Sequence, residues 1–165
     1  MVPQRDRNAQ GRPENARPRD RFGRPLPRGS VDQLAQREDP AAVVADVDQA
    51  LHRAVELFDA ERFFEAHEFL EWIWKSDEVE PADRDFWKGV TQVAVGFAHA
   101  QRGNASGATT LLTRATRYVA PYPSPHHGVD RAALVAATRA VVAQIAASGA
   151  SPQLQFPRFP LAPVG

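Results

Sequence analysis

Ionisable residues interrupt an apolar stripe between residues 62 and 75, and their types could support metal or acid–base chemistry. On a helix of about 100° per residue, one stripe of this segment would contain Phe63, Phe64, His67, Leu70, Glu71 and Trp74. His67 and Glu71 lie one turn apart within it. Burial of such groups costs several kcal/mol unless they are hydrogen-bonded, paired or bound to a metal. The stripe therefore predicts a buried His/Glu site.

A divalent metal ion is the cofactor that this spacing could hold, because His67 and Glu71 project from the same helical face. His99 on the next predicted helix could supply a third ligand. Gln92 lies seven positions before His99, two turns along one face, and would also point into the site. We expect these four side chains to converge between antiparallel helices, as the ligands of metal-binding bundles do.

The neighbours of these residues complete the predicted site. Phe64 and Trp74 would line a pocket together with Gln92. Glu68 is about 100° around the helix from His67 and is predicted at the rim, whereas Glu65 is predicted to point further away. In a metal-dependent hydrolase, Glu68 or Glu71 would accept a proton from a metal-bound water. The adjacent pair His126–His127, in a proline-rich loop, resembles a fragment of a metal-binding tract.

A structural role explains the same polar residues equally well. A buried His–Glu pair bridged to a glutamine and a second histidine could fix the register of the helices. The protein would then be a non-enzymatic interaction or scaffold module. Short antiparallel helix pairs with small residues such as Gly107 and Ala108 also describe tetratricopeptide-like scaffolds. An enzyme needs an open cavity at His67 and Glu71, whereas a structural network needs them sealed.

Helical periodicity recurs along the chain and no strand pattern is visible, so the predicted fold class is all-α, a compact antiparallel bundle of about five helices. The third helix has no charged residue between Lys88 and Arg102, which predicts a place at the centre of the bundle. Residues that cap or end helices predict the limits of the five helices. These are Asp39 to about Ala60, 62–75, Pro81 to about Arg102, Asn104 or Ser106 to about Val119, and Asp130 to Gly149.

Composition divides the 165 residues into three parts. Residues 1–38 are rich in arginine and proline and are predicted to be a disordered arm. Residues 39–150 are predicted to form the bundle domain, and residues 151–165 a proline-rich extended strap. Residues 1–30 hold eight arginines against three acidic residues, a net charge of +5, while the whole chain is neutral.

These properties limit the partners and the location of the protein. The neutral chain argues against nucleic acid as a partner, apart from weak, salt-sensitive contacts of the basic arm. The absence of cysteine excludes disulfides and thiol chemistry. No apolar run approaches the roughly 20 residues that span a bilayer, and no apolar stretch follows Met1, so we expect a cytoplasmic protein without membrane partners. A homo-oligomer could form through the faces that carry the tryptophans.

Residues 57 to about 119 resemble a family catalogued as a domain of unknown function, family 309. The resemblance rests on the segments 64–68 (FEAHE) with Glu71 and Trp74, 89–92 (GVTQ) with Ala94, and His99, 102–104 (RGN) and 107–108 (GA). It implies a compact helical bundle. Members of this family have carried the label "predicted metal-dependent hydrolase", which on this chain would fall on His67, Glu68, Glu71 and His99.

Overall fold

The computed structural model describes residues 17–163, and the chain divides into two compact units, Met1–Arg37 and Glu38–Gly165. In the first unit, residues 17–37 form turns and one isolated bridge, between Arg19 and Pro25. Asp32 Oδ1 accepts hydrogen bonds from the backbone N–H groups of Arg19 (3.1 Å) and Leu34 (3.0 Å), which lower the pKa of its carboxyl. The disordered arm stays a prediction, and residues 1–16 lie outside the described part.

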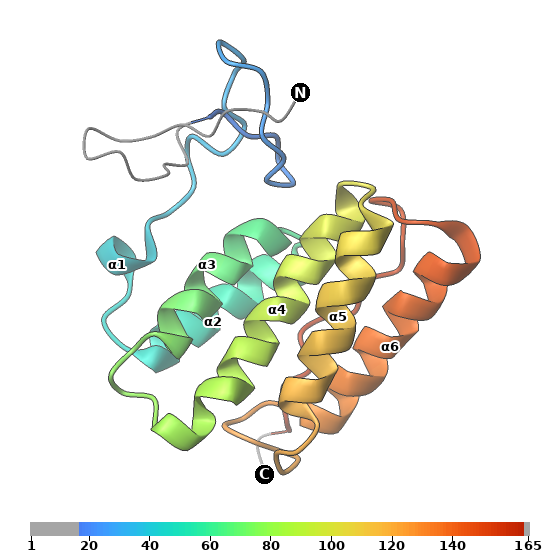
Figure 1. Cartoon of the computed structure of the whole chain (residues 1–165). Coiled ribbons are helices and arrows are strands. Elements are labelled where there is room, and N and C mark those ends of the chain that lie inside the picture. Colours follow the sequence, from blue (N-terminus) through green and yellow to red (C-terminus); the bar gives the residue numbers. More distant parts are fainter. Residues whose placement is uncertain (1–16, 164–165) are drawn as a thin grey trace. The chain divides into compact units, whose positions relative to one another are not determined.

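The second unit is helical, and within residues 17–163 no strand is present beyond isolated bridges, so the all-α class is confirmed. No helix in this range is long and apolar enough to cross a membrane. The elements, drawn in Figure 1, are α1 (Pro40–Val43), α2 (Val47–Asp59), α3 (Phe63–Trp74), the 3-10 helix η1 (Pro81–Asp83), α4 (Arg84–Gln101), α5 (Ala105–Val119) and α6 (Arg131–Ser148).

The first predicted helix is wrong as a single element. Val44 leaves the helical region, with φ −119° and ψ 145°, and thereby ends α1. Asp46 then starts α2 as an N-cap, because its side chain accepts a hydrogen bond from Gln49 N (2.8 Å). Pro81 likewise opens the short helix η1, and α4 begins only at Arg84.

The last two helices begin and end close to their predicted limits. Asn104 caps α5 through Gly107 N (3.0 Å), and Asp130 caps α6 through Ala133 N (3.0 Å). Gly149 follows α6 with φ +83°, a conformation that favours glycine. These three ends depend on local side-chain and backbone chemistry, which explains why they could be predicted.

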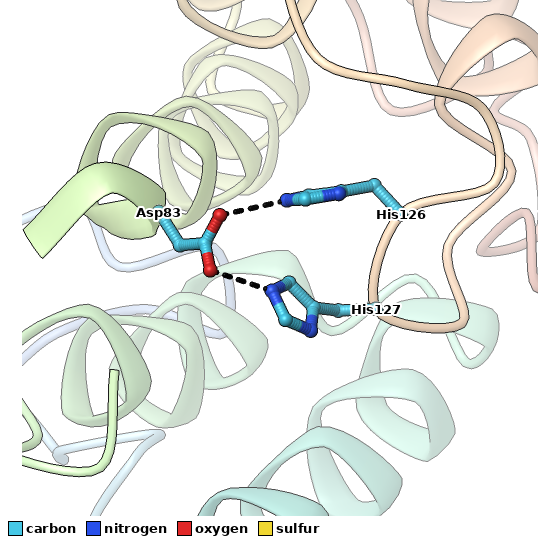
Figure 2. A group of neighbouring side chains, drawn as sticks. All are labelled: Asp83, His126 and His127. Carbon is cyan, nitrogen blue, oxygen red and sulfur yellow. Dashed lines mark hydrogen bonds and ion pairs between the residues drawn. The ribbon is translucent and has the colours of Figure 1, made fainter. Parts of the chain in front are cut away.

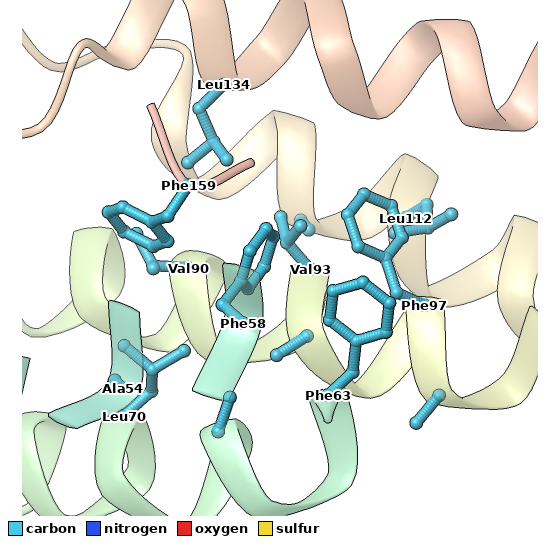
Figure 3. Close-up of a cluster of buried hydrophobic side chains, with 14 of the residues drawn as sticks. Ala54, Phe58, Phe63, Leu70, Val90, Val93, Phe97, Leu112, Leu134 and Phe159 are labelled. Carbon is cyan, nitrogen blue, oxygen red and sulfur yellow. The ribbon is translucent and has the colours of Figure 1, made fainter. Parts of the chain in front are cut away.

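The core contains buried side chains from α2 to α6 and from the C-terminal tail, some of which Figure 3 shows. The rings of Phe58 and Phe63 lie 4.9 Å apart, Phe63 and Phe97 5.2 Å apart, and Phe58 and Phe159 5.3 Å apart, all edge to face. Such pairs add about 0.5–1.5 kcal/mol each beyond the burial of their area. Helix α4 lies between α3 and α5 (Figure 1), which agrees with the central position predicted from its lack of charge.

Two glycines allow α4 and α5 to pack closely. A Cβ atom on Gly89 would lie 2.7 Å from Val119 Cγ1, and one on Gly96 would lie 2.5 Å from Leu112 Cδ2. Gly107, one of the small residues noted in the sequence, has another neighbour: a Cβ atom there would collide with the side chain of Asn104, the cap of its own helix. The glycines that this close approach requires are therefore those of α4.

The tail after α6 is not helical and packs back onto the bundle. Leu154 and Phe159 are buried, and the backbone N–H of Phe159 donates to Asp59 Oδ1 (2.7 Å). Further on, Leu161 forms an isolated antiparallel bridge with Val129 in the loop between α5 and α6. The tail thus connects the end of α2 to that loop.

Candidate functional site

The predicted stripe of α3 is rotated relative to the core. The buried residues of α3 are Phe63, Glu65, Ala66, Phe69, Leu70 and Ile73. Phe63 and Leu70 are therefore buried as predicted, but Phe64, His67, Glu71 and Trp74 are only half-buried. The reason is that α3 contacts both α2 and α4, so the side between those two neighbours forms its core face.

Glu65 corrects the sequence prediction most clearly. It was expected to point away from the buried side, yet its side chain is only 8% exposed. The guanidinium of Arg62 donates to both carboxylate oxygens, through Nε (2.8 Å) and an Nη atom (2.7 Å). This two-point pairing compensates for the burial of the Glu65 charge.

His67 and Glu71 are neighbours, as their spacing requires. His67 Nε2 lies 3.9 Å from Glu71 Oε2, and the two side chains are 17% and 39% exposed. The other ring nitrogen of His67 contacts the carbonyl oxygen of Phe64, and the other oxygen of Glu71 pairs with Lys75. The pair thus lies at the edge of the bundle and shares its atoms with other partners.

The remaining predicted site residues have separate surroundings. His99 Nδ1 lies 3.0 Å from Asn104 Nδ2, and burial, followed by the charge of Arg102, lowers the pKa of His99. Gln92 is half-buried and its Oε1 has no hydrogen-bond partner, while Glu68 is half-buried.

Among residues 17–163, His67, Glu71 and His99 do not belong to any group of three His, Asp or Glu side chains whose ligand atoms all lie within 4.8 Å of one another. The metal and catalytic roles assigned to them stay predictions.

The one such group in the described part of the chain is Asp83, His126 and His127 (Figure 2). Asp83 Oδ1 lies 2.9 Å from His126 Nε2, and Asp83 Oδ2 lies 2.8 Å from His127 Nε2. The side chains of Asp83 and His126 are 17% and 18% exposed, and that of His127 is 48% exposed. The group is therefore sheltered on one side and open to solvent at His127.

The position of Asp83 explains why its carboxylate is available. Asp83 ends η1 and occupies the N-cap position of α4, but its side chain makes no cap hydrogen bond. Both oxygens face the histidines instead. The hydrogen bond from His127 is the largest cause of a lowered Asp83 pKa, and His126 adds to it although burial acts in the opposite direction. The carboxylate is thus held ionised.

The loop between α5 and α6 presents the two histidines. The backbone groups of His126 and Val129 exchange two hydrogen bonds of 2.9 Å, which close a tight turn. Within this turn His127 has φ +47°, a left-handed conformation that costs a non-glycine residue about 1–3 kcal/mol. The hydroxyl of Tyr122 donates to the carbonyl oxygen of Ala82 (2.6 Å), which ties the loop to η1 directly beside Asp83.

The C-terminal tail holds the other side of this loop. Ala162 N donates to Gly128 O (2.8 Å), and Asp130 N donates to Pro160 O (2.9 Å). Together with the bridge between Val129 and Leu161, these bonds fix the backbone on both sides of the loop tip. The tail therefore supports the segment that carries His126 and His127.

Aromatic rings restrict both imidazoles. The ring of His126 lies edge to face with Phe86 (centroids 4.7 Å apart) and 5.1 Å from Tyr122. The ring of His127 stacks at 6.1 Å on Trp87. These contacts define the directions in which the Nε2 atoms point and favour a preorganised site.

A cavity of about 360 Å³ borders Asp83 and His127. Its apolar walls come from α2, the α3–η1 connection and α4, and its other residues are carboxylates and His127. The lining residues are Val47, Asp48, Leu51, Glu78, Val79, Glu80, Asp83, Trp87 and His127. This volume is within the range typical of small-molecule sites.

Sequence reasoning found only part of this group. The adjacent histidines were noted, but Asp83 was not among the candidate ligands. Asp83 and His126 are 43 positions apart, so no short motif joins them. The available signal was an adjacent histidine pair in a chain that contains five histidines in all.

Comparisons with known proteins confirm the family resemblance. Residues 51–111 match a family described as "Domain of unknown function (DUF309)". A segment of 63 residues is 38% identical to the "Uncharacterized protein YpuF" of Bacillus subtilis (strain 168), and it covers 38% of this chain and 36% of that protein. No solved structure matches the chain. Asp83 lies inside the range that matches the family, whereas His126 and His127 lie outside it.

Proposed function

Since the family that residues 51–111 match has no assigned function, we propose one from the site itself: a metal-dependent hydrolase whose divalent ion is held by Asp83, His126 and His127. The observation that carries this proposal is the convergence of one carboxylate and two imidazoles at the wall of a cavity. The metal-dependent hydrolase suggested by the family resemblance would then act at these residues instead of at His67, Glu68, Glu71 and His99.

The donor set supports a first-row transition metal ion. Imidazole nitrogens suit zinc, iron, nickel and copper, and a carboxylate adds the negative charge that a divalent ion requires. Each Asp83 oxygen lies within 2.9 Å of the Nε2 atom of one histidine. The ligand atoms therefore need little rearrangement to face a common point. Because three protein ligands leave coordination positions open, the site suits catalysis better than a purely structural role.

A divalent ion at this site would polarise a substrate oxygen and lower the pKa of a bound water. The chain itself contributes the surroundings. Val79 and Trp87 offer apolar walls that could hold the body of a substrate, and Glu80 in the same lining is a candidate proton acceptor. Glu78 is less available, because its Oε2 accepts a hydrogen bond from Val47 N (2.9 Å). The carboxylates in the lining favour neutral or cationic substrates over anionic ones.

Metal content is the first test. We would purify the chain without a polyhistidine tag, measure metals by plasma mass spectrometry, and titrate metal-free protein with Zn²⁺, Mn²⁺ and Ni²⁺ by calorimetry. We expect about one ion per chain in the wild type. Asp83→Asn keeps an oxygen that can accept a hydrogen bond but removes the charge, and it should weaken binding at least about tenfold. His126→Ala and His127→Ala should do the same.

Two control variants make this test specific. His52→Ala removes an exposed histidine of α2 and should leave metal affinity unchanged. The double variant His67→Ala/Glu71→Ala tests the site predicted from the sequence. If the double variant contains no metal while Asp83→Asn still binds the ion, the proposed site is wrong and the His67/Glu71 site on α3 is supported. Screening for hydrolysis follows only if the metal depends on Asp83.

A structural clamp is the second candidate, because each oxygen of Asp83 is already hydrogen-bonded to one histidine. In this case the group would join η1 to the α5–α6 loop in a non-enzymatic interaction module. No metal in the wild type, together with a large loss of thermal stability in Asp83→Asn, would favour the clamp.

Three further predictions from the sequence remain proposals. They are a cytoplasmic location, weak contacts of the basic arm with nucleic acid, and a homo-oligomer.

A further inference from the structure

A second cavity of about 360 Å³ opens between α5 and α6. It shares no lining residue with the cavity that borders Asp83 and His127. Four of its lining residues come from α5 and two from α6, at spacings that place each set on one helical face. They are Leu112, Thr113, Thr116, Arg117, Arg139 and Val142.

The charge of this cavity is uniformly positive. Its lining contains two guanidinium groups and no carboxylate. Within residues 17–163, neither Arg117 nor Arg139 makes an ion pair, whereas Arg53, Arg62 and Arg158 each pair with a carboxylate. None of the 16 acidic side chains among residues 38–165 belongs to α5 or α6. No carboxylate of these two helices therefore neutralises Arg117 or Arg139, and the cavity keeps the positive charge of both.

The rest of the lining is apolar or hydroxylic. Leu112 is fully buried, whereas Val142 on α6 is half-buried and accessible. The hydroxyl of Thr116 donates to the carbonyl oxygen of Thr113 (2.8 Å), which turns that hydroxyl back onto its own helix. The cavity therefore combines two cationic side chains with an accessible apolar one.

We propose that this α5–α6 cavity binds a small amphipathic anion, a carboxylate or phosphate group joined to a short aliphatic chain. The guanidinium groups of Arg117 and Arg139 match the oxygens of such an anion, because Arg presents paired N–H donors to carboxylate and phosphate. The aliphatic chain lies against Val142, the half-buried apolar side chain of the lining. This site is independent of the proposed metal site.

Calorimetry on the full chain with defined probes tests this proposal. The probes are hexanoate and hexyl phosphate, compared with hexanol, which lacks the charge, and inorganic phosphate, which lacks the chain. We expect at least one of the amphipathic anions to bind at least about tenfold more tightly than either comparison compound. A hydrogen bond to a charged group changes the affinity by about this factor. The preferred one then distinguishes a carboxylate ligand from a phosphate ligand.

A matched pair of variants locates the binding site. Arg117→Gln and Arg139→Gln should each weaken the binding about tenfold or more. Arg114→Gln is the control, because Arg114 is an exposed arginine of the same helix that does not line the cavity. Thermal unfolding checks that all three variants remain folded. Absence of binding by both amphipathic probes, or an equal loss in Arg114→Gln, would overturn the proposal.

Discussion

His127 Nε2 lies 2.8 Å from Asp83 Oδ2, although 44 positions separate the two residues in the chain. The contact joins the start of α4 to the loop that follows α5. It can form because α4 and α5 are antiparallel neighbours with a short connection, so that the chain returns after α5 to the end of the bundle at which α4 began. The tail and Tyr122 then hold the loop in place.

The Asp83–His127 contact predicts a measurable coupling in metal-free protein. Asp83→Ala should destabilise the fold by about 1–3 kcal/mol, because two hydrogen bonds to a charged group are lost. In a double-mutant cycle with His127→Ala, the coupling should be about 0.5–3 kcal/mol. Urea unfolding in the presence of a chelator measures both values. Asp77→Ala, at an exposed position of the α3–η1 connection, serves as the control and should change the stability little.

The close approach of α4 and α5 predicts that an added methyl group at Gly89 is destabilising. Gly89→Ala gains up to about 1 kcal/mol of helix propensity. The new Cβ atom would nevertheless lie 2.7 Å from Val119 Cγ1 and 3.2 Å from the backbone oxygen of Ala115. Overpacking of this kind costs about 1–3 kcal/mol, so we expect a net loss of stability in thermal unfolding. Val119→Ala in the same chain should relieve part of that loss, and strictly additive effects would contradict this explanation.

The C-terminal tail is predicted to contribute to stability through Phe159. The residue is 5% exposed, and its ring packs edge to face on Phe58. Phe159→Ala should cost about 3–5 kcal/mol, the range found for buried phenylalanines. Leu161→Ala is a suitable comparison, since Leu161 is 50% exposed and should change the stability by less than about 0.5 kcal/mol. Equal effects of the two substitutions in urea unfolding would show that the tail does not pack as described.

His99 predicts how stability changes with pH. Its pKa in the folded protein is lower than the ordinary value of 6.5, mainly because of burial. As the pH falls below 6.5, the unfolded chain therefore binds a proton before the folded one does, and the free energy of unfolding decreases. At pH values well above 6.5, His99 is neutral in both states and the stability lost on its protonation is fully retained.

His99→Gln should reduce the loss of stability between pH 7.5 and pH 5, values chosen to be roughly one unit or more on either side of a normal histidine pKa. Urea unfolding at several pH values gives the measurement. His52→Gln changes an exposed histidine and should leave the pH dependence of the wild type intact. If the two variants behave alike, His99 is not the group responsible.

The helices and several of their limits could be predicted from the sequence, because they depend on local interactions. Asn104, Asp130 and Gly149 act on the backbone within a few positions of themselves, and their roles are visible in the chain. The break at Val44 was missed because helical spacing continues across it, and only the cap formed by Asp46 separates α1 from α2. The central place of α4 followed from its lack of charged residues.

The orientation of each helix and the grouping of distant side chains were decided by the tertiary structure. The sequence alone determined that His67 and Glu71 share a helical face, but the packing of α3 against α2 and α4 placed Glu65 in the interior and His67 at the edge. Periodicity defines a stripe but not the direction in which the neighbours lie. The group of Asp83, His126 and His127 depends on antiparallel packing and on a loop held by the tail, and these are contacts that no local pattern contains.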